Sequence, residues 1–267
     1  MPEQEINQLS LLALLSDFGD RDVYVSVMKG VVSQINPLLR VIDLTHQIPP
    51  QNIAAARFCL MNAYSYFPVG TVYVAVVDPG VGSKRRAIAV EFAQGFLVGP
   101  DNGIFSGVLS QSPAINTVEL TNPNYWRTPQ PSKTFHGRDI FAPVGAHLAN
   151  GVTLKQLGQE IDSATLVQLD IGECHQTNSG VTGCIQYIDH FGNLVSNIPE
   201  KYVQGKNWSV QAAGVIIPGC ETYSDVKVGE VAALVGSHGW VEVAINGGNA
   251  SSQLQINWQD LLQVLFV

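Results

Sequence analysis

The first half of the chain alternates short apolar runs with segments in which apolar residues recur every three or four positions. A helix is predicted between the apolar runs at residues 11–15 and 41–44. Its buried face would consist of Val23, Val27, Val31 and Ile35. A second helix is predicted at residues 53–67. This alternation is typical of strands that cross over through helices into a mainly parallel sheet.

Residues 71–77 form the most strongly β-branched run and are predicted to be a central strand, since buried parallel strands are continuously apolar. Residues 87–92 and 95–98 are predicted to pair with each other. A further helix is predicted to open at residues 134–139 and to run through Asn150 to Gly151.

The pattern changes after about residue 165. Helix-length runs largely disappear, and short β-rich runs separated by Gly, Asn and Pro occupy residues 183–188, 210–217, 230–234, 240–245 and 262–267. We therefore predict an α/β protein with an N-terminal domain at residues 1–165 and a C-terminal antiparallel β domain, a barrel or a sandwich, at residues 166–267.

The charge balance favours a cationic or zwitterionic small molecule as the partner. The formal net charge is −8, and the 14 basic residues are scattered, whereas a nucleic-acid backbone requires them clustered. No apolar run reaches the roughly 18 residues that span a bilayer. Residues 1–8 lack the basic flank of a signal peptide, and the four cysteines show no C-x-x-C spacing. We predict a cytoplasmic protein with neither a nucleic-acid nor a membrane partner.

The most informative polar segment is V-D-P-G-V-G-S-K-R-R at residues 77–86. It places Asp78 seven residues before Arg85, across a glycine-rich turn at the end of the predicted central strand. A neighbouring cation keeps a carboxylate ionised and oriented, as a group that holds a water molecule requires. Two alternatives are a turn capped by the Asp78 carboxylate itself, and a phosphate loop, which the missing G-x-x-x-x-G-K-[ST] pattern disfavours.

Asp17 and Asp22 follow the first predicted strand, where open α/β sheets bind their ligands. Asp17 is a candidate for binding a ribose diol, and helix capping by an acidic residue is an equally supported alternative. A divalent metal is disfavoured, because no further ligand cluster has a recognisable spacing. The Cys and His residues at 174–190 match no zinc pattern. His136 is a candidate catalyst, although a histidine at a helix start is more often structural.

Six segments in order carry a resemblance that covers nearly the whole chain. They are S-D-F-G-D-R-D at 16–22, V-D-P-G-V-G-S-K-R-R at 77–86, G-P-D-N-G at 99–103, T-F-H-G-R-D-I-F-A-P at 134–143, I-D-H-F-G-N at 188–193 and S-H-G-W-V-E at 237–242. Together they resemble the S-adenosyl-L-methionine hydroxide adenosyltransferase family, which shares its fold with the adenosyl fluoride and chloride synthases.

The resemblance implies an N-terminal α/β domain, a C-terminal β-barrel, and a homotrimer whose active sites lie between the N-terminal domain of one subunit and the C-terminal domain of its neighbour. It implies that S-adenosyl-L-methionine and water give adenosine and L-methionine, with neither a metal nor another cofactor. The catalytic residues would be Asp78, Arg85 and His136. The substrate-binding residues would be Asp17 at the ribose, Asp22 and Asp189 at the methionine amino group, Phe191, Asn193, Ser237 and Asn246 around the adenine, and Gly137, His238 and Glu242.

Two rival functions stay open from the sequence. A halide-dependent 5′-halo-5′-deoxyadenosine synthase shares the fold, but a carboxylate beside a halide pocket would repel the anion. A non-catalytic sensor of adenosine or S-adenosyl-L-methionine would have no evident need for an acid, a guanidinium and an imidazole at the reacting carbon. Residues 83–84 and His238 depart from the family pattern at loop positions, where we expect altered affinity and no change of reaction.

Overall fold

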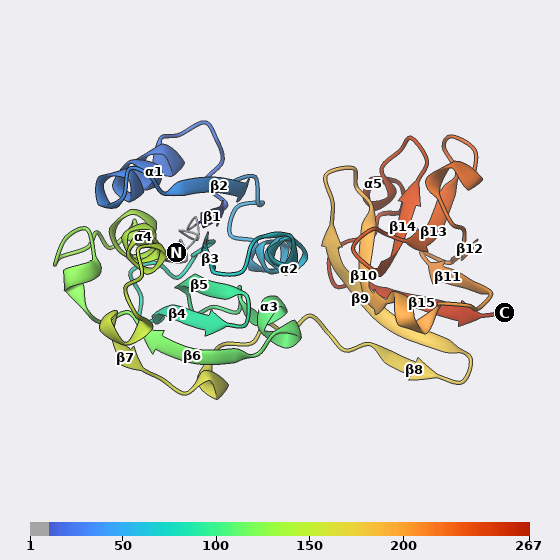
Figure 1. Ribbon diagram of the computed structural model, residues 1–267. Coiled ribbons are helices and arrows are strands. Elements are labelled where there is room, and N and C mark those ends of the chain that lie inside the picture. The colour runs from blue at the N-terminus through green and yellow to red at the C-terminus, as the bar shows by residue number, and fades with distance from the viewer. Residues whose placement is uncertain (1–10) are drawn as a thin grey trace, which may run out of the picture. The chain divides into compact units, whose positions relative to one another are not determined.

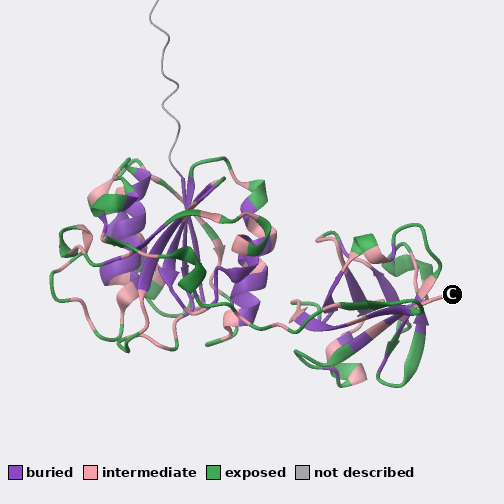
Figure 2. Ribbon diagram, turned by 90° about the horizontal axis from the view of Figure 1, so that it is seen from below, coloured by how far each residue is buried: buried purple, intermediate pink, exposed green. Residues whose placement is uncertain are grey.

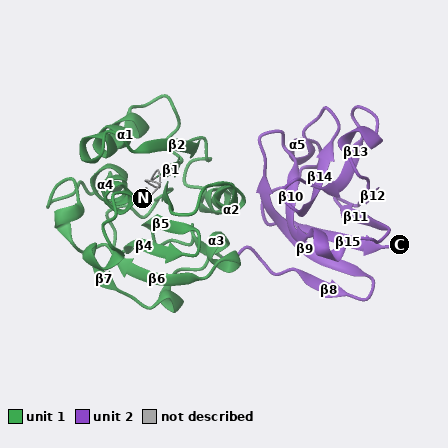
Figure 3. Cartoon of the chain, viewed as in Figure 1, with its two compact units in different colours: residues 1–169 green, residues 170–267 purple. Residues whose placement is uncertain are grey.

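The computed structural model describes residues 11–267, so the segment at residues 1–8, in which no signal peptide is predicted, lies outside the described residues. The chain divides between Leu169 and Asp170 into two compact units (Figure 3). The sequence pattern placed this division four residues earlier. Each unit has a hydrophobic core of its own.

A seven-stranded sheet in the order β2-β1-β3-β5-β4-β6-β7 forms the centre of the first unit (Figure 1). The strands are β1 (Leu11–Ser16), β2 (Arg40–Thr45), β3 (Thr71–Val76), β4 (Ala87–Phe92), β5 (Gly95–Pro100), β6 (Ala114–Glu119) and β7 (Gln159–Glu160). The first four strands in this order run parallel, and the others pair antiparallel. The predicted α/β class and the pairing of β4 with β5 are confirmed, and the antiparallel β6 and β7 extend the sheet.

Helices cover both faces of this sheet (Figure 2). They are α1 (Tyr24–Ile35), α2 (Ile53–Ala63), α3 (Ser106–Gln111), α4 (Ala142–Ala149) and short 3-10 turns such as Tyr64–Tyr66, with a π-helix at Gly137–Phe141 that leads into α4. Alternate strand residues face opposite sides, so Leu12 and Leu14 of β1 pack in one core with Met28 of α1 and Val144 of α4. Within residues 11–267 we find no helix with the length and apolarity needed to cross a bilayer.

The helix predicted at residues 53–67 ends early, at Ala63. A longer α-helix would need a backbone N–H at Pro68 to bond the carbonyl of Tyr64, and proline has none. That carbonyl accepts from the backbone N–H of Phe67 at 3.2 Å, as in a 3-10 turn, and from the hydroxyl of Tyr73 on β3 at 2.8 Å. The missing N–H of Pro68 therefore explains why the helical segment, which continues after α2 as the 3-10 turn Tyr64–Tyr66, stops before Phe67.

The second unit is an antiparallel sheet in the order β12-β11-β15-β9-β10-β14-β13, with β8 beside β9. Its elements are β8 (His175–Thr177), β9 (Gly180–Ile188), β10 (Leu194–Pro199), β11 (Trp208–Ala212), β12 (Val215–Pro218), β13 (Val231–Val235), β14 (Trp240–Ile245), α5 (Ala250–Leu254) and β15 (Leu261–Phe266). A bridge between Gly219 and Ala233 joins the two ends of the sheet. The sheet is thus nearly closed around its core, which confirms the predicted antiparallel barrel.

The apolar run at residues 210–217, predicted as one stretch of strand, is a hairpin of β11 and β12. The two turn residues, Ala213 and Gly214, have φ angles of 49° and 76°. Two consecutive positive φ angles are what a tight hairpin turn requires. The turn escaped the sequence pattern because alanine rarely adopts this conformation.

Candidate active site

The parallel strands of the first unit bring the predicted catalytic segments to one edge of the sheet. β1 ends at Ser16, directly before Asp17, and β3 ends at Val76, two residues before Asp78. Ser16 pairs with Val76, so both acids leave the sheet at its carboxyl edge, where open α/β sheets bind ligands. His136 comes from a distant part of the chain, as the residue before the π-helix.

Asp78, Arg85 and His136 form one hydrogen-bonded group. Arg85 Nε lies 3.0 and 3.1 Å from the two carboxylate oxygens of Asp78. Arg85 Nη2 donates both to Asp78 Oδ2 and to His136 Nδ1, the latter at 2.7 Å. The side chains of Asp78 and Arg85 are only 5% and 10% exposed, so their attraction is weakly screened by water. The three residues proposed as catalytic therefore meet, and the Asp78 carboxylate faces a guanidinium instead of capping its own turn.

The protonation state of His136 follows from its contact with Arg85. Arginine has donors only, so the Nδ1 atom that faces it must be unprotonated, and the ring proton sits on Nε2. Burial lowers the pKa of His136, the Arg85 charge lowers it further, and the Asp78 carboxylate opposes them only in part. His136 is therefore a neutral imidazole near neutral pH, with its accepting lone pair already occupied.

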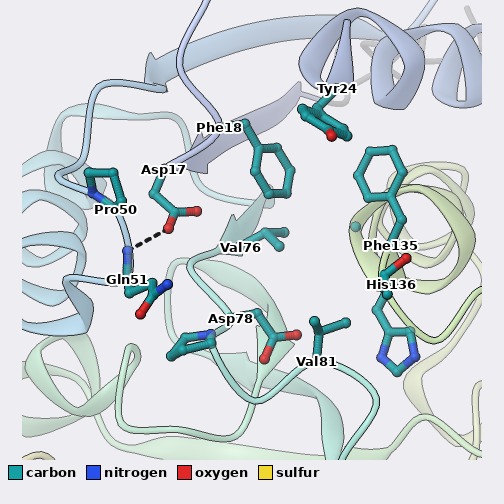
Figure 4. Close-up of a pocket in the computed structure, with 13 residues that line it drawn as sticks. Asp17, Phe18, Tyr24, Pro50, Gln51, Val76, Asp78, Val81, Phe135 and His136 are labelled. Carbon is teal, nitrogen blue, oxygen red and sulfur yellow. Dashed lines mark hydrogen bonds between the residues drawn. The ribbon is translucent and has the colours of Figure 1, made fainter. Parts of the chain in front are cut away.

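This group borders an open cavity of about 420 Å³, within the size range of small-molecule sites. Figure 4 shows Asp78 and His136 on one part of the wall and Asp17 beside Gln51 on another. The rings of Phe18, Tyr24 and Phe135 contact one another, with centroids 5.2 to 5.7 Å apart, and supply an aromatic wall. The cavity thus combines an apolar surface with carboxylates and an imidazole.

Asp17 lines this cavity, and its Oδ2 atom accepts from the backbone N–H of Gln51 at 2.7 Å. The capping alternative is wrong, because Val23 precedes α1 and no side chain caps that helix. Gly137 is buried at the cavity wall. Asp22 is exposed and does not line the cavity.

The predicted substrate-binding residues of the second unit line a separate cavity of about 630 Å³. They are Asp189, Phe191, Asn193, Ser237, His238, Glu242 and Asn246. The Asp189 carboxylate accepts from the backbone N–H groups of Phe191 and Asn193, at 2.9 and 2.8 Å, and so shapes the loop after β9. The Phe191 ring is 70% exposed at the edge of this cavity.

Glu242 is buried at the wall of the second cavity and is 2% exposed. Its carboxylate accepts from the Tyr223 hydroxyl at 2.5 Å and lies 2.9 Å from His238 Nε2. Burial raises the pKa of Tyr223, and the bond to Glu242 raises it further. Glu242 is thus engaged by protein groups and would act on a ligand through Tyr223 and His238.

Sequence reasoning missed several residues that line the two cavities. Phe18 and Phe135 lie inside the matched segments and could have been found there. Pro50 and Gln51 follow β2, whose carboxyl end lies at the same sheet edge, so the edge rule also points to them. Tyr24 and Tyr223 carried no signal, because a tyrosine in the first turn of α1 or in a loop is unremarkable. Among residues 11–267, no three or more His, Cys, Asp or Glu side chains are grouped so as to hold a metal ion.

The fold and the cavities define a class of protein: an α/β domain that carries an acid, a guanidinium and an imidazole at its carboxyl edge, joined to a β-barrel with a polar cavity. Comparison with protein-family models shows to which family of this class the chain belongs. The model of the SAM hydroxide adenosyltransferase N-terminal domain matches residues 12–158, and that of the C-terminal domain matches residues 183–263. The chain belongs to the SAM hydroxide adenosyltransferase family.

Similar proteins agree with this assignment. An (R)-S-adenosyl-L-methionine hydrolase of Salinispora tropica is 38% identical over 254 residues, covering 95% of this chain and 97% of its own. One of Thermus thermophilus is 38% identical over 250 residues, covering 90% and 93%. A fluorinase of an Actinoplanes species is 26% identical over 271 residues, covering 88% and 91%. The crystal structure of a conserved protein from Thermotoga maritima superposes with a TM-score of 0.88 at 33% identity, covering 95% and 99%.

Proposed function

We propose that this protein hydrolyses S-adenosyl-L-methionine to adenosine and L-methionine. The observation that carries the proposal is the bonded group of Asp78, Arg85 and His136 beside a cavity at the sheet's carboxyl edge. Two relatives with 38% identity are named as hydrolases of this compound, which supports the same substrate here. The net charge of −8 also suits a cationic substrate.

The proposed reaction is a displacement at the C5′ carbon of the ribose. The oxygen of a water molecule forms a bond to C5′ while the C5′–S bond breaks, and the electron pair of that bond leaves with the sulfur. The sulfonium becomes the neutral thioether of methionine, and the attacking water releases one proton. Because the leaving group is excellent, the protein has two tasks: to hold the water in line with the C5′–S bond, and to receive its proton.

Asp78 is the proposed proton acceptor. Its carboxylate oxygens can accept from water, whereas the lone pair of His136 Nδ1 is already used by Arg85. Arg85 orients both neighbours and transfers no proton. The Nε2–H of His136 is available as a donor that fixes the water oxygen. A general base placed in this way accelerates a reaction typically by about 10²–10⁴-fold.

We also propose that the protein is a homotrimer in which the first unit of one subunit and the second unit of its neighbour complete one site. The support is that the predicted substrate-binding residues fall into two separate cavities, one in each unit. Asp17 would hold the ribose, and the cavity of the second unit would enclose the adenine. Asp22, exposed in the single chain, would join Asp189 at the methionine amino group.

The halide-dependent alternative has weaker support. The fluorinases are more distant relatives, at 24 to 26% identity. A fluoride or chloride ion approaching C5′ would meet the carboxylate oxygens of Asp78, which repel an anion at short range although Arg85 balances the net charge of the pair. A non-catalytic sensor would gain nothing from the bridging arginine.

Product analysis tests the reaction. Purified full-length protein is incubated in heavy-oxygen water with the (R) and (S) sulfonium epimers of S-adenosyl-L-methionine, with and without halide salts. We expect adenosine that carries the heavy oxygen at its 5′ position, in the same amount with halide present. A 5′-halo-5′-deoxyadenosine as the main product would overturn the hydrolase assignment, and binding without turnover would indicate the sensor.

The variant Asp78→Asn tests the proton acceptor, because it keeps the shape of the side chain and removes its charge. We expect turnover to fall by about 10²–10⁴-fold, with adenosine binding nearly unchanged. Asp101→Asn is the matched control, since the Asp101 side chain is 4% exposed and pairs with the neighbouring Arg86 at 2.5 Å. Wild-type turnover in Asp78→Asn would remove this residue from the mechanism.

Subunit mixing tests the shared site. Asp78→Asn and Asn193→Ala are each expected to be nearly inactive alone, because each damages one of the two cavities. Mixed trimers pair an intact first unit with an intact second unit and should regain activity. Light scattering should give three times the chain mass. A fully active monomer, or no recovery on mixing, would refute the shared site.

A further inference from the structure

Ser16, His46, Asp43 and Lys29 form a chain of polar contacts outside the group that carries the proposed reaction. His46 Nδ1 lies 2.7 Å from Ser16 Oγ, and His46 Nε2 lies 3.0 Å from Asp43 Oδ1. Lys29 Nζ donates to Asp43 Oδ2 at 2.5 Å. The Ser16 hydroxyl donates to Nδ1 when the ring proton is on Nε2, where it faces the Asp43 carboxylate at ion-pair distance but outside hydrogen-bond geometry.

The residue types are those of a serine hydrolase triad, but the geometry excludes a nucleophile. Ser16 is 0% exposed, so no substrate reaches its oxygen. The ring is also reversed, since in the hydrolase triad Nε2 faces the serine and Nδ1 faces the acid. The chain of bonds must act on the backbone and side chains around Ser16.

Ser16 directly precedes the proposed ribose-binding residue Asp17. The Ser16 hydroxyl oxygen also accepts from the backbone N–H of Phe18, at 3.3 Å. The His46 carbonyl accepts from the backbone N–H of Gly19, at 2.8 Å. His46 therefore binds the end of β1 through its side chain and the segment after β1 through its backbone.

The segment after β2 also carries a wall of the cavity. Pro50 and Gln51 line it, and Gln51 donates its backbone N–H to Asp17 Oδ2 at 2.7 Å (Figure 4). The orientation of the Asp17 carboxylate thus depends on how closely the segments after β1 and β2 are held. The part-buried bond between Ser16 and His46 links the end of β1 to the residue that follows β2.

We propose that His46 is a positioning residue, which sets the Asp17 carboxylate for a ribose diol through its bond to Ser16. The inference rests on the proposed function, which supplies the nucleoside. A misplacement of about 1 Å costs far more in an oriented site than in a flexible one. Asp43 and Lys29 orient the His46 ring from a more exposed position, with side chains 39% and 38% exposed.

The test compares the binding of adenosine and 2′-deoxyadenosine by calorimetry, with the full-length protein. The ratio of the two dissociation constants reports the diol contact, and general loss of stability leaves it unchanged. A hydrogen bond to a carboxylate predicts that wild-type protein prefers adenosine by about 10- to 100-fold. Two variants separate the two contacts of the His46 ring. His46→Asn keeps an acceptor near the Nδ1 position, beside Ser16, whereas His46→Gln reaches toward Asp43 only.

In His46→Gln and in the milder Ser16→Ala, the preference should fall by about 3- to 10-fold, as expected for a misplaced hydrogen bond. His46→Asn should keep it within about twofold of wild type. Ser106→Ala, which removes another buried hydroxyl of the first unit and lines neither cavity, should keep it fully. A wild-type preference in both His46→Gln and Ser16→Ala refutes the positioning role, as does an equal loss in His46→Asn.

The outcomes separate this inference from the proposed reaction. Protein that shows the expected ratios but forms no adenosine from S-adenosyl-L-methionine upholds the role of His46 and overturns the hydrolase assignment. Wild-type protein that releases adenosine but binds both nucleosides equally overturns the role of His46 and leaves the reaction standing.

Discussion

Arg85→Lys is the sharpest test of the reactive group, because it keeps the positive charge and removes the bridge. The guanidinium contacts Asp78 through two nitrogens and His136 through one of them. A lysine ammonium is a point charge on a flexible stem, so it can hold one partner in place but not both in a fixed geometry. We expect the introduced ammonium to stay with the carboxylate and to release the imidazole.

The size of the effect follows from the lost bond. A hydrogen bond to a charged group contributes about 1.5–3 kcal/mol, which corresponds to about a 10- to 150-fold fall in kcat/KM if the bond orients the transition state. The loss should appear mainly in kcat, because Arg85 does not line the cavity and touches the substrate only through its neighbours.

The assay is adenosine release from S-adenosyl-L-methionine, measured by chromatography beside a thermal melt. Arg86→Lys is the matched control: the neighbouring arginine binds Asp101 through Nε and Nη2, at 2.8 and 2.5 Å, and lines neither cavity. We expect this control to change stability and to leave kcat within about twofold, as for a change outside the site. Full kcat in Arg85→Lys, or an equal fall in Arg86→Lys, would refute the bridging role.

Three further outcomes are expected. Burial and a nearby cation lower the pKa of His136, so kcat/KM should be constant near pH 7 and fall only below the usual histidine value of about 6.5; a decline that begins above it would contradict a neutral imidazole. Gly82→Ala should destabilise the folded protein by about 1–3 kcal/mol and lower turnover, because the φ of Gly82 is +76° and a Cβ would clash with the Lys133 carbonyl. Gly205→Ala is the control: its φ is +72° but its Cβ would enter open space, so adenosine release should keep its wild-type rate. Burial would raise the pKa of Asp139, but hydrogen bonds from two arginines outweigh it and lower the pKa. The stability that this carboxylate contributes should therefore persist above pH ~4 and fade as the pH falls below that value. Asp139→Asn should flatten the acid side of a plot of melting temperature against pH, and an unchanged slope there would count against this reasoning.

The sequence predicted those parts of the fold that local patterns determine. The β-branched run predicted β3, and the helical spacing of apolar residues predicted α1. The change to short β-rich runs predicted the second unit. The errors lie where a local pattern is overruled. α2 gives way to a 3-10 turn that stops before Phe67, since Pro68 lacks an N–H, and an unusual positive φ at Ala213 turns one apolar run into a hairpin.

The candidate site was predictable from local sequence only where its residues are close together along the chain. Asp78 and Arg85 are close in sequence, so a single turn brings them together, whereas His136 is joined to them only by the folded chain and was placed through the family resemblance. The bond between Ser16 and His46 had no sequence signature, because the pattern predicted a mainly parallel sheet but not that β1 and β2 are neighbours with Leu15 opposite Thr45.

The arginine bridge also explains how a carboxylate can serve beside a cationic substrate. A bare carboxylate next to a sulfonium would stabilise the bound substrate as much as the transition state, and such uniform binding does not raise kcat. Arg85 makes the pair neutral overall, which weakens this attraction in the ground state. As the water oxygen bonds to C5′ its proton becomes strongly acidic, and its hydrogen bond to Asp78 strengthens only then. The guanidinium therefore shifts the interaction of Asp78 from the substrate toward the transition state, at some cost in the affinity for S-adenosyl-L-methionine.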